Sequence, residues 1–409
     1  MKAYIFVTHG MSGIGGGQRY VLSKAKWLVE NGWEVCICHV AHGDIILDCS
    51  MARLIDIPEL RAHPKTLGKK RTQEIVDSVL AQYKGADEVY VESSAPYLGM
   101  WGEEIARAAH GRHLCYALEE APTPEDRGFL EFKRGRHELA FIKNTVAAAT
   151  FGDDLSNATS YDDCVLTAYN PSPIEDISFD GKTIKGDFTI GCISRLDKPA
   201  VMLMMEGLGE FCDAHHDVSI ALVFIGDTPY EQVKTNIEAY GQTRDNLGIQ
   251  ILGYMSPIPL GLVSRFDFCI GKAGAAMITS ELGIPTIWYS IEDELAGFSH
   301  YEKVDGEYKL VLPSNDEGKT LPQLLEETFL QGGLKRMEGQ DAPGLLQRHI
   351  DYSDHLAFIP ESNAYDYYDV QSAPVTWQRR LVSLWLKLFK NTDYEAPLVA
   401  LREHFGKQS

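Results

Sequence analysis

The sequence lacks the patterns of an exported, membrane-spanning or metal-centred protein. No run approaches the ~20 apolar residues of a spanning helix, and a strand-like run from Lys2 replaces the basic head of a signal peptide. The eight cysteines form neither a CxxC pair nor a zinc-ligand spacing, and there is no Asp-x-Asp motif. We therefore predict a cytoplasmic protein with buried, reduced thiols and no metal site.

Basic charge is also scarce. The 409 residues include 58 acidic and only 38 basic side chains, which gives a formal net charge of −20. A phosphate backbone would be repelled by this mean field, so we predict no nucleic-acid partner. The chain is too long for one ordinary core, and two domains of ~150–200 residues each are expected.

Short apolar runs alternate with amphipathic segments in two series. In the first, strands are expected at 3–7, 34–40, 88–91, 113–118 and 145–149, with helices at 18–30, 73–83 and 97–109. The second has strands at 188–193, 220–225, 249–252, 266–270 and 286–289. Such runs predict parallel sheets covered on both faces, hence an α/β chain of two doubly wound, Rossmann-like domains. We place the domains at 1–180 and 181–371, with helices at 372–409 that return to the first domain.

Ligands of open parallel sheets bind beyond the carboxyl ends of the strands. The junction from Phe268 to Pro285 is the best such place, because small residues let the backbone approach a phosphate and a helix start attracts anions. We expect that helix to begin near Ala275, and we predict that Glu281, about two turns along, accepts the hydroxyls of a ribose. The predicted phosphate-binding residues here are Lys272, Gly274, Ala275 and Ala276.

Two further junctions of the second series lie at the same predicted sheet edge. Arg195 and Lys198 follow its first strand and offer cations suited to pyrophosphate oxygens. Gly253 and Tyr254 follow another strand, where the backbone can contact a base. The alternative for all these residues is an ordinary strand–turn–helix corner with solvated charges.

The loop from Thr8 to Gln18 joins the first strand to its helix. It fits neither the dinucleotide fingerprint, which would require glycine at Gln18, nor a P-loop, which would require Gly-Lys-Ser/Thr. A glycine loop that approaches a sugar or diphosphate through Gly16 and Gly17 fits better. A loop whose glycines serve only turn geometry is the alternative.

At these junctions the chain resembles GT-B-type glycosyltransferases, especially the bacterial polysaccharide and lipopolysaccharide group (family 4-like). The matching segments are Gly15–Tyr20, Ile193–Lys198, Leu252–Tyr254 and Gly274–Pro285. The resemblance implies a nucleotide-diphosphate sugar bound mainly by the C-terminal half, in a cleft between the halves. It also implies an acceptor bound by the N-terminal half and a final helix, within Pro374–Phe389, that crosses back.

Position by position, the resemblance implies that Arg195 and Lys198 bind the diphosphate, Glu281 the ribose, and Gly16 and Gly17 line the sugar-phosphate site. Two departures bear on sugar specificity and stereochemistry. Ala273 stands where the family commonly has glutamate, and Glu119-Glu120 follow a strand after which the family often has histidine.

The resemblance implies hexosyltransferase-like transfer to a glycan, lipid-linked or other hydroxyl acceptor in cell-surface polysaccharide synthesis. The donor is a substrate, so no cofactor is expected, and helix termini and cations would make the reaction metal-independent. Base candidates are Glu119, Glu120 and His9, for which a structural role is the alternative. Two rival functions are a non-catalytic GT-B-like partner of another transferase and a sugar-nucleotide epimerase.

The segment 377–390 is basic, aromatic and amphipathic. It suits a helix packed on the first domain. The alternative is peripheral contact with the inner face of an anionic membrane. Lys69-Lys70-Arg71 and 133–136 are further basic candidates for surface contact, against the simpler interpretation of solvated charge.

Overall fold

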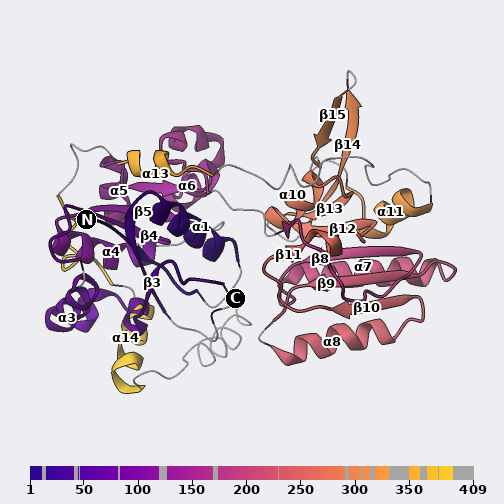
Figure 1. Ribbon diagram of the computed structural model, residues 1–409, viewed down its shortest axis with the longest axis horizontal. Coiled ribbons are helices and arrows are strands. Elements are labelled where there is room, and N and C mark those ends of the chain that lie inside the picture. Colours follow the sequence, from indigo (N-terminus) through magenta and orange to yellow (C-terminus); the bar gives the residue numbers. More distant parts are fainter. Residues whose placement is uncertain are drawn as a thin grey trace. The chain divides into compact units, whose positions relative to one another are not determined.

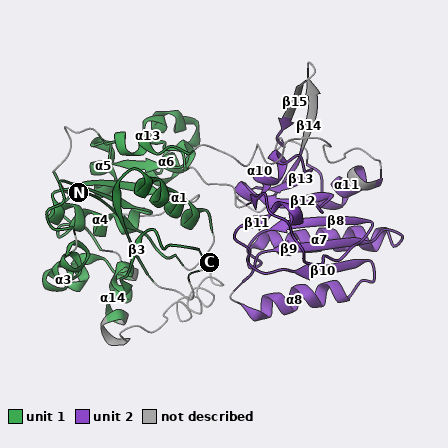
Figure 2. Cartoon of the chain, in the orientation of Figure 1, with its two compact units in different colours: residues 1–171, 350–409 green, residues 172–349 purple. Residues whose placement is uncertain are grey.

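The chain forms two compact units in the computed structural model (Figure 2). Unit 1 comprises Met1–Pro171 and Ile350–Ser409, and unit 2 comprises Ser172–His349. Each unit contains one large, mainly parallel sheet (Figure 1). The structure describes residues 1–11, 15–40, 45, 47–81, 83–118, 127–168, 174–228, 230–290, 294–304, 307–313, 318–330, 350–359, 366–375 and 377–389.

Unit 1 has a six-stranded parallel sheet in the order β3-β2-β1-β4-β5-β6. Its strands are β1 (Lys2–Val7), β2 (Trp33–His39), β3 (Arg53–Asp56), β4 (Glu88–Ser93), β5 (Arg112–Ala117) and β6 (Leu139–Phe141). The first segment adds the helices α1 (Gly16–Glu30), η1 (Pro58–Arg61), α2 (Pro64–Leu67), α3 (Lys69–Leu80), α4 (Pro96–Ala109), α5 (Arg127–Gly135), α6 (Asn144–Phe151) and η2 (Leu155–Cys164). The returning segment adds α13 (Ser353–Ala357) and α14 (Trp377–Phe389).

Strand β1 shows why helices cover both faces of this sheet. Successive side chains of a strand point to opposite faces. Ala3, Ile5 and Val7 pack in one core with residues of α3 and α4. Tyr4 and Phe6 pack in the other core with residues of α1. Both faces are therefore apolar and buried, as the uninterrupted apolar run predicts.

Unit 2 has a seven-stranded sheet in the order β10-β9-β8-β12-β13-β14-β15, in which β14 and β15 are antiparallel. Its strands are β8 (Phe188–Ile193), β9 (Ile220–Ile225), β10 (Leu247–Ile251), β12 (Phe268–Lys272), β13 (Thr286–Tyr289), β14 (Leu295–Val304) and β15 (Glu307–Val311). Short strands β7 (Ile174–Glu175) and β11 (Ile258–Pro259) pair separately. The helices are α7 (Pro199–Ala214), α8 (Glu231–Gln242), α9 (Leu260–Val263), α10 (Ala273–Glu281), α11 (Leu321–Leu325) and η3 (Glu326–Leu330).

The fold is thus two doubly wound α/β units with a C-terminal helix returned to unit 1, as predicted. One predicted strand is wrong: residues 145–149 lie in helix α6. The alanines of this run favour a helix, and the short strand β6 takes the sheet position instead. No described helix is long and apolar enough to cross a membrane.

The chain returns to unit 1 earlier than the sequence suggested. The predicted second domain extended to 371, whereas unit 2 ends at His349 and residues from Ile350 belong with unit 1. The physical reason is burial, because Tyr352 and Ile359 lie in the core beneath α1, and Val370 and Ala373 lie in the core around α5 and α6.

Candidate functional site

The strand order of unit 2 reverses beside β8. Strands β9 and β10 lie on one side of β8, and β12 and β13 lie on the other. Open α/β sheets bind ligands outside the carboxyl ends of the strands at such a reversal. The candidate site therefore consists of the loops after β8, β9, β10 and β12, which we call the unit 2 edge. It comprises Ser194–Lys198, Gly226–Thr228, Leu252–Tyr254 and Lys272–Ala276.

Backbone hydrogen bonds link the loops of the unit 2 edge. The amide of Ser194 donates to the carbonyl of Ile225 (3.2 Å), and the amide of Leu196 donates to that of Asp227 (3.2 Å). Gly226 permits this approach, because a Cβ added there would lie 1.9 Å from the carbonyl oxygen of Ser194. Gly226 is not among the predicted site residues, although a glycine directly after a buried strand is a signal of close backbone approach.

Charged side chains of both signs gather on this edge. The Arg195 guanidinium, 55% exposed, forms a bidentate pair with Asp197 (2.8 and 3.1 Å). Lys234 of α8 lies 2.7 Å from Asp227. Burial raises the pKa of Tyr254, and the positive charge of Arg195 opposes that rise. Asp197, Asp227 and Lys234 are not among the predicted site residues, although Asp227 follows a strand just as Arg195 does.

Two helices begin at the unit 2 edge without a side-chain cap. Lys198 is the N-cap of α7, and Lys272 is the N-cap of α10. Neither makes a side-chain hydrogen bond to the amides of the first turn. Such amides and the positive end of the helix attract anions. The predicted phosphate-binding residues Gly274, Ala275 and Ala276 all lie in the first turn of α10.

The turn into α10 differs from the prediction. Lys272 is the last residue of β12, and the helix begins at Ala273 rather than near Ala275. Ala273 has φ +50°, a left-handed conformation that costs a non-glycine residue energy. This one residue turns the chain from strand to helix. Glu281, half-buried, is the last residue of α10 and lies about 11 Å along the helix axis from Gly274.

The strand order of unit 1 reverses beside β1, so the loops after β1 and β4 form a second candidate edge. There the Ser94 hydroxyl donates to Thr8 Oγ1 (3.0 Å). His9 is exposed, and its ring lies edge-on to Tyr97 with 6.0 Å between centroids. His9, one of the base candidates, therefore lies at this edge. The other base candidates, Glu119 and Glu120, lie outside the described residues.

Gly16 and Gly17 are exposed in the first turn of α1. The N-cap Gly15 has no side chain to cap the amides, and a Cβ added to Gly17 would meet no heavy atom within 4 Å. Gln18 Nε2 donates to the carbonyl of Gly10 (3.1 Å) and so holds the loop after β1 against the helix start. The start of α1 thus also lies at the carboxyl edge of unit 1, with no side-chain cap among the described residues.

Comparison with known proteins was made by sequence and by structure. No family model matches the chain, and no curated protein matches its sequence. A glycosyltransferase from Rickettsia africae is similar in structure, with TM-score 0.52 and 13% identity over 96% of this chain and 100% of that one. The lipopolysaccharide outer core galactosyltransferase WaaB gives TM-score 0.49 and 13% identity over 94% and 100%. Acinetobacter baumannii MurG gives 0.41 and 15% over 95% and 100%.

The chain has a GT-B glycosyltransferase-like fold. Identities this low establish the architecture alone. Within this GT-B-type fold, unit 1 also contains two buried groups of ionisable side chains that the sequence analysis did not predict.

The first buried group, the Lys24–Glu92 network, fixes α1. The Lys24 ammonium lies 2.5 Å from the Glu92 carboxylate, and both side chains are fully buried. The hydroxyls of Tyr4 and Tyr20 donate to the same carboxylate (2.5 and 2.9 Å). Lys24 also donates to His355 Nδ1 (3.2 Å). The helix that presents Gly16 and Gly17 is therefore linked to β4 and to the returning chain.

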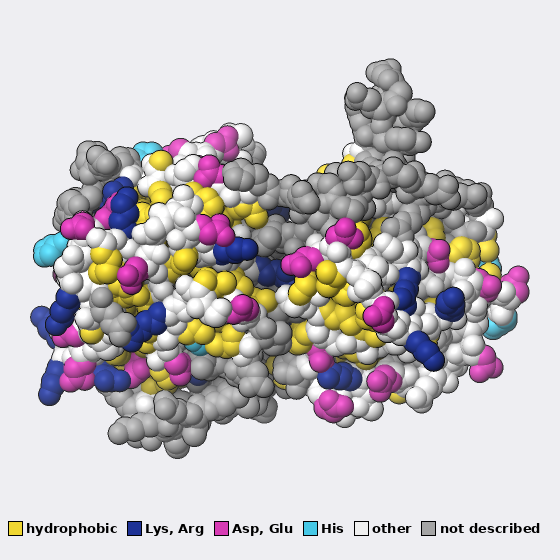
Figure 3. Space-filling model, in the orientation of Figure 1, with side chains coloured by type: hydrophobic (Ala, Val, Ile, Leu, Met, Phe, Trp, Pro, Cys, Tyr) yellow, Lys and Arg dark blue, Asp and Glu magenta, His cyan; other side chains and the backbone are white. Residues whose placement is uncertain are grey.

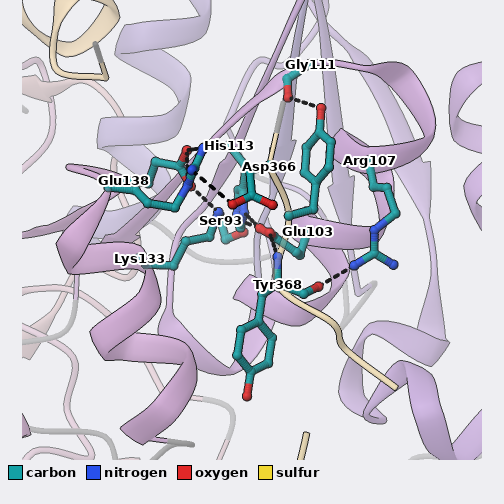
Figure 4. Close-up of polar contacts among 11 residues, drawn as sticks. Ser93, Glu103, Arg107, Gly111, His113, Lys133, Glu138, Asp366 and Tyr368 are labelled. Carbon is teal, nitrogen blue, oxygen red and sulfur yellow. Dashed lines mark hydrogen bonds and ion pairs between the residues drawn. The ribbon is translucent and has the colours of Figure 1, made fainter. Parts of the chain in front are cut away.

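The second buried group, the Glu103–His113 network, has the bonding order of a catalytic triad (Figure 4). The Ser93 hydroxyl donates to His113 Nε2 (2.7 Å), and His113 Nδ1 donates to Glu103 (2.7 Å). All three side chains are buried, so no substrate reaches them. Lys133 lies 2.5 Å from Glu103, which also accepts from the amide of Tyr368 (2.5 Å). The role of this network is therefore structural, because it links the returning chain to α4, α5 and β5.

Proposed function

We propose that this chain transfers a sugar, hexosyltransferase-like, from a nucleotide-diphosphate sugar to a hydroxyl of a glycan or lipid-linked acceptor in cell-surface polysaccharide synthesis. The observation that carries the proposal is the unit 2 edge. Two helix N-termini without side-chain caps and the cations Arg195 and Lys198 meet there, at the reversal of strand order. Amides and cations so placed suit a diphosphate.

The diphosphate is also the leaving group of the reaction. As the glycosyl bond breaks, charge grows on the diphosphate oxygens, and fixed amides and cations stabilise it without reorganisation. The Arg195 fork is occupied by Asp197, so a diphosphate would compete with that carboxylate for the same donors. We propose that Lys198 and the amides of Gly274, Ala275 and Ala276 bind the diphosphate beside Arg195. Lys272 adds positive charge, Gly253 and Tyr254 contact the base, and Glu281 binds the ribose.

The acceptor half of the proposal rests on the edge of unit 1. His9 is exposed there, beside Tyr97, and the open start of α1 presents Gly16 and Gly17. If transfer inverts the anomeric centre, a base must take the acceptor proton, and His9 is the base candidate that the structure describes. Because helix ends and cations carry the charge of the leaving group, we propose a metal-independent reaction.

The test is a turnover assay with a panel of uridine and guanosine diphosphate sugars, in EDTA and in Mg²⁺. We expect one donor to release its nucleoside diphosphate at similar rates in both, faster when a hydroxyl acceptor is added. Arg195→Ala should abolish most of this release. A donor sugar epimerised without acceptor would establish the epimerase instead, and binding without turnover of any donor would establish a non-catalytic partner.

A further inference from the structure

Helix α14 packs on unit 1 through its polar face. Ser383 is buried, and its hydroxyl is hydrogen-bonded to that of Thr66 in α2. The Arg379 guanidinium donates to the carbonyl of Arg61 (3.2 Å) and lies over the ring of Tyr97, 4.5 Å from its centroid. Polar contacts of this kind link the inner face of the helix to η1 and α2.

The outer face of α14 is apolar. Trp377, Leu381 and Leu384 are 66%, 50% and 53% exposed. Their spacing of four and three residues places them on one side of the helix. An amphipathic helix ordinarily buries its apolar face, so α14 has the reverse orientation. Three large apolar side chains in one row on a fixed helix indicate a binding surface.

Exposed cations lie on α14 and on α3. Arg380 is exposed on α14, and Lys69 and Lys70 are exposed at the start of α3, which adjoins α2. None of the three forms an ion pair with the described residues. Basic and acidic side chains are both visible over α3 at the edge of unit 1 in Figure 3. The three exposed cations belong to a chain whose formal net charge is −20.

We propose that the outer face of α14 docks on a membrane surface that carries anionic lipid headgroups. The row of Trp377, Leu381 and Leu384 enters the headgroup layer, where tryptophan is favoured, while Arg380, Lys69 and Lys70 contact the anionic headgroups. A helix of 13 residues is about 20 Å long and lies in the plane of the surface. In a symmetric dimer the same exposed cations would face one another across the interface, so a second copy of the chain is the poorer occupant.

The docked helix would bring lipid to the acceptor edge of unit 1. Arg379 on its inner face contacts Tyr97, and Tyr97 contacts His9. One helix diameter, about 10 Å, therefore separates the membrane-facing row from that edge. This inference rests on the proposed function and deepens it, because it selects a lipid-linked acceptor.

Flotation with phosphatidylcholine vesicles, with and without phosphatidylglycerol, tests the docking. The full chain should bind the anionic vesicles, and added salt should release it. The double variant Leu381→Gln with Leu384→Gln should bind at least about tenfold more weakly, because its apolar row no longer enters the lipid. The matched control is Met202→Gln with Leu203→Gln on α7, where the two side chains are 39% and 44% exposed. This control should bind as the wild type does.

Other outcomes would overturn the proposal. These are equal binding of the Leu381→Gln, Leu384→Gln double variant and the wild type, or no binding of the wild type to anionic vesicles. A dimer that dissociates in the Leu381→Gln, Leu384→Gln variant would make the face a subunit interface. Calorimetry with a nucleoside diphosphate separates this failure from that of the proposed function. The leucine variants should keep nucleotide affinity, and Arg195→Ala should lose it while keeping vesicle binding.

Discussion

At the scale of single residues, two buried histidines of unit 1 are held neutral. Burial and the Lys133 cation lower the pKa of His113 from 6.5 to about 4. Burial and the Lys24 cation lower that of His355 to about 3. The unfolded chain therefore binds protons first as the pH falls. The free energy of unfolding should decrease below about pH 6.5 and continue to decrease until the folded pKa values are reached.

Between pH 7 and pH 5, each of the two histidines should lower the free energy of unfolding by about 2 kcal/mol. Glu103, whose pKa is lowered to about 2, chiefly by its ion pair with Lys133 against the cost of burial, adds a loss in the same direction below about pH 4.5. Urea denaturation at the two pH values measures the change. The variant His113→Gln should show a decrease that is smaller by the contribution of that histidine. A free energy of unfolding that is equal at both pH values would contradict neutral histidines.

The Lys24–Glu92 pair gives a second prediction at this scale. Glu92→Gln leaves the ammonium of Lys24 buried without its counter-charge, and we expect a loss of about 3–5 kcal/mol in the free energy of unfolding. Adding Lys24→Met removes the unpaired charge and should recover part of that loss. Chemical denaturation of the three variants measures this coupling. A double variant less stable than Glu92→Gln alone would show that the pair is not the source of the effect.

At the scale of elements, the turn into α10 stores strain at one residue. Ala273 has φ +50°, so Ala273→Gly should stabilise the protein by about 1 kcal/mol. The control is Ala275→Gly in the first turn of the same helix, which should destabilise it by about 0.5–1 kcal/mol. Denaturation curves measure both changes. Equal destabilisation by both glycines would remove the claim of strain.

The elements also show what could be predicted from the sequence. Apolar runs such as 220–225 identified the strands, and the carboxyl-end rule then located Arg195, Lys198 and the start of α10. This rule does not distinguish Asp227, a single acidic residue after a strand, from the other polar residues that follow strands. Periodicity is a local signal, so it could not find the contact between Tyr90 and the carbonyl of His355, 265 residues apart. The run 145–149 is apolar, as a buried strand would be, but its alanines favour a helix, and it lies in helix α6.

At the scale of the whole molecule, unit 1 is completed by the end of the chain. Tyr352 and Ile359 lie in its core on one face of the sheet, and Val370 and Ala373 lie in another core beside α5. Adjacent residues of β4, Glu92 and Ser93, point to opposite faces and belong to the two buried networks. The returning chain is thus bound on both faces of the sheet.

This arrangement predicts different behaviour for the two units made as fragments. Residues 1–171 should not fold, because they lack His355, Tyr368 and the core residues of the returning chain. Residues 172–349 contain their own two cores and should fold alone. Circular dichroism and denaturant titration distinguish these outcomes. A cooperatively folded 1–171 fragment would show that the returning chain is dispensable.

The central claim is that the unit 2 edge binds a nucleoside diphosphate, and calorimetric titration with uridine and guanosine diphosphates tests it most directly. The wild type should bind one of them. The double variant Arg195→Ala with Lys198→Ala should bind it at least about tenfold more weakly, since each charge-assisted hydrogen bond contributes roughly 1.5–3 kcal/mol. Lys185→Ala, an exposed lysine before β8 at the opposite edge, is the control that should bind normally. Equal affinity of the double variant and the wild type would contradict the account.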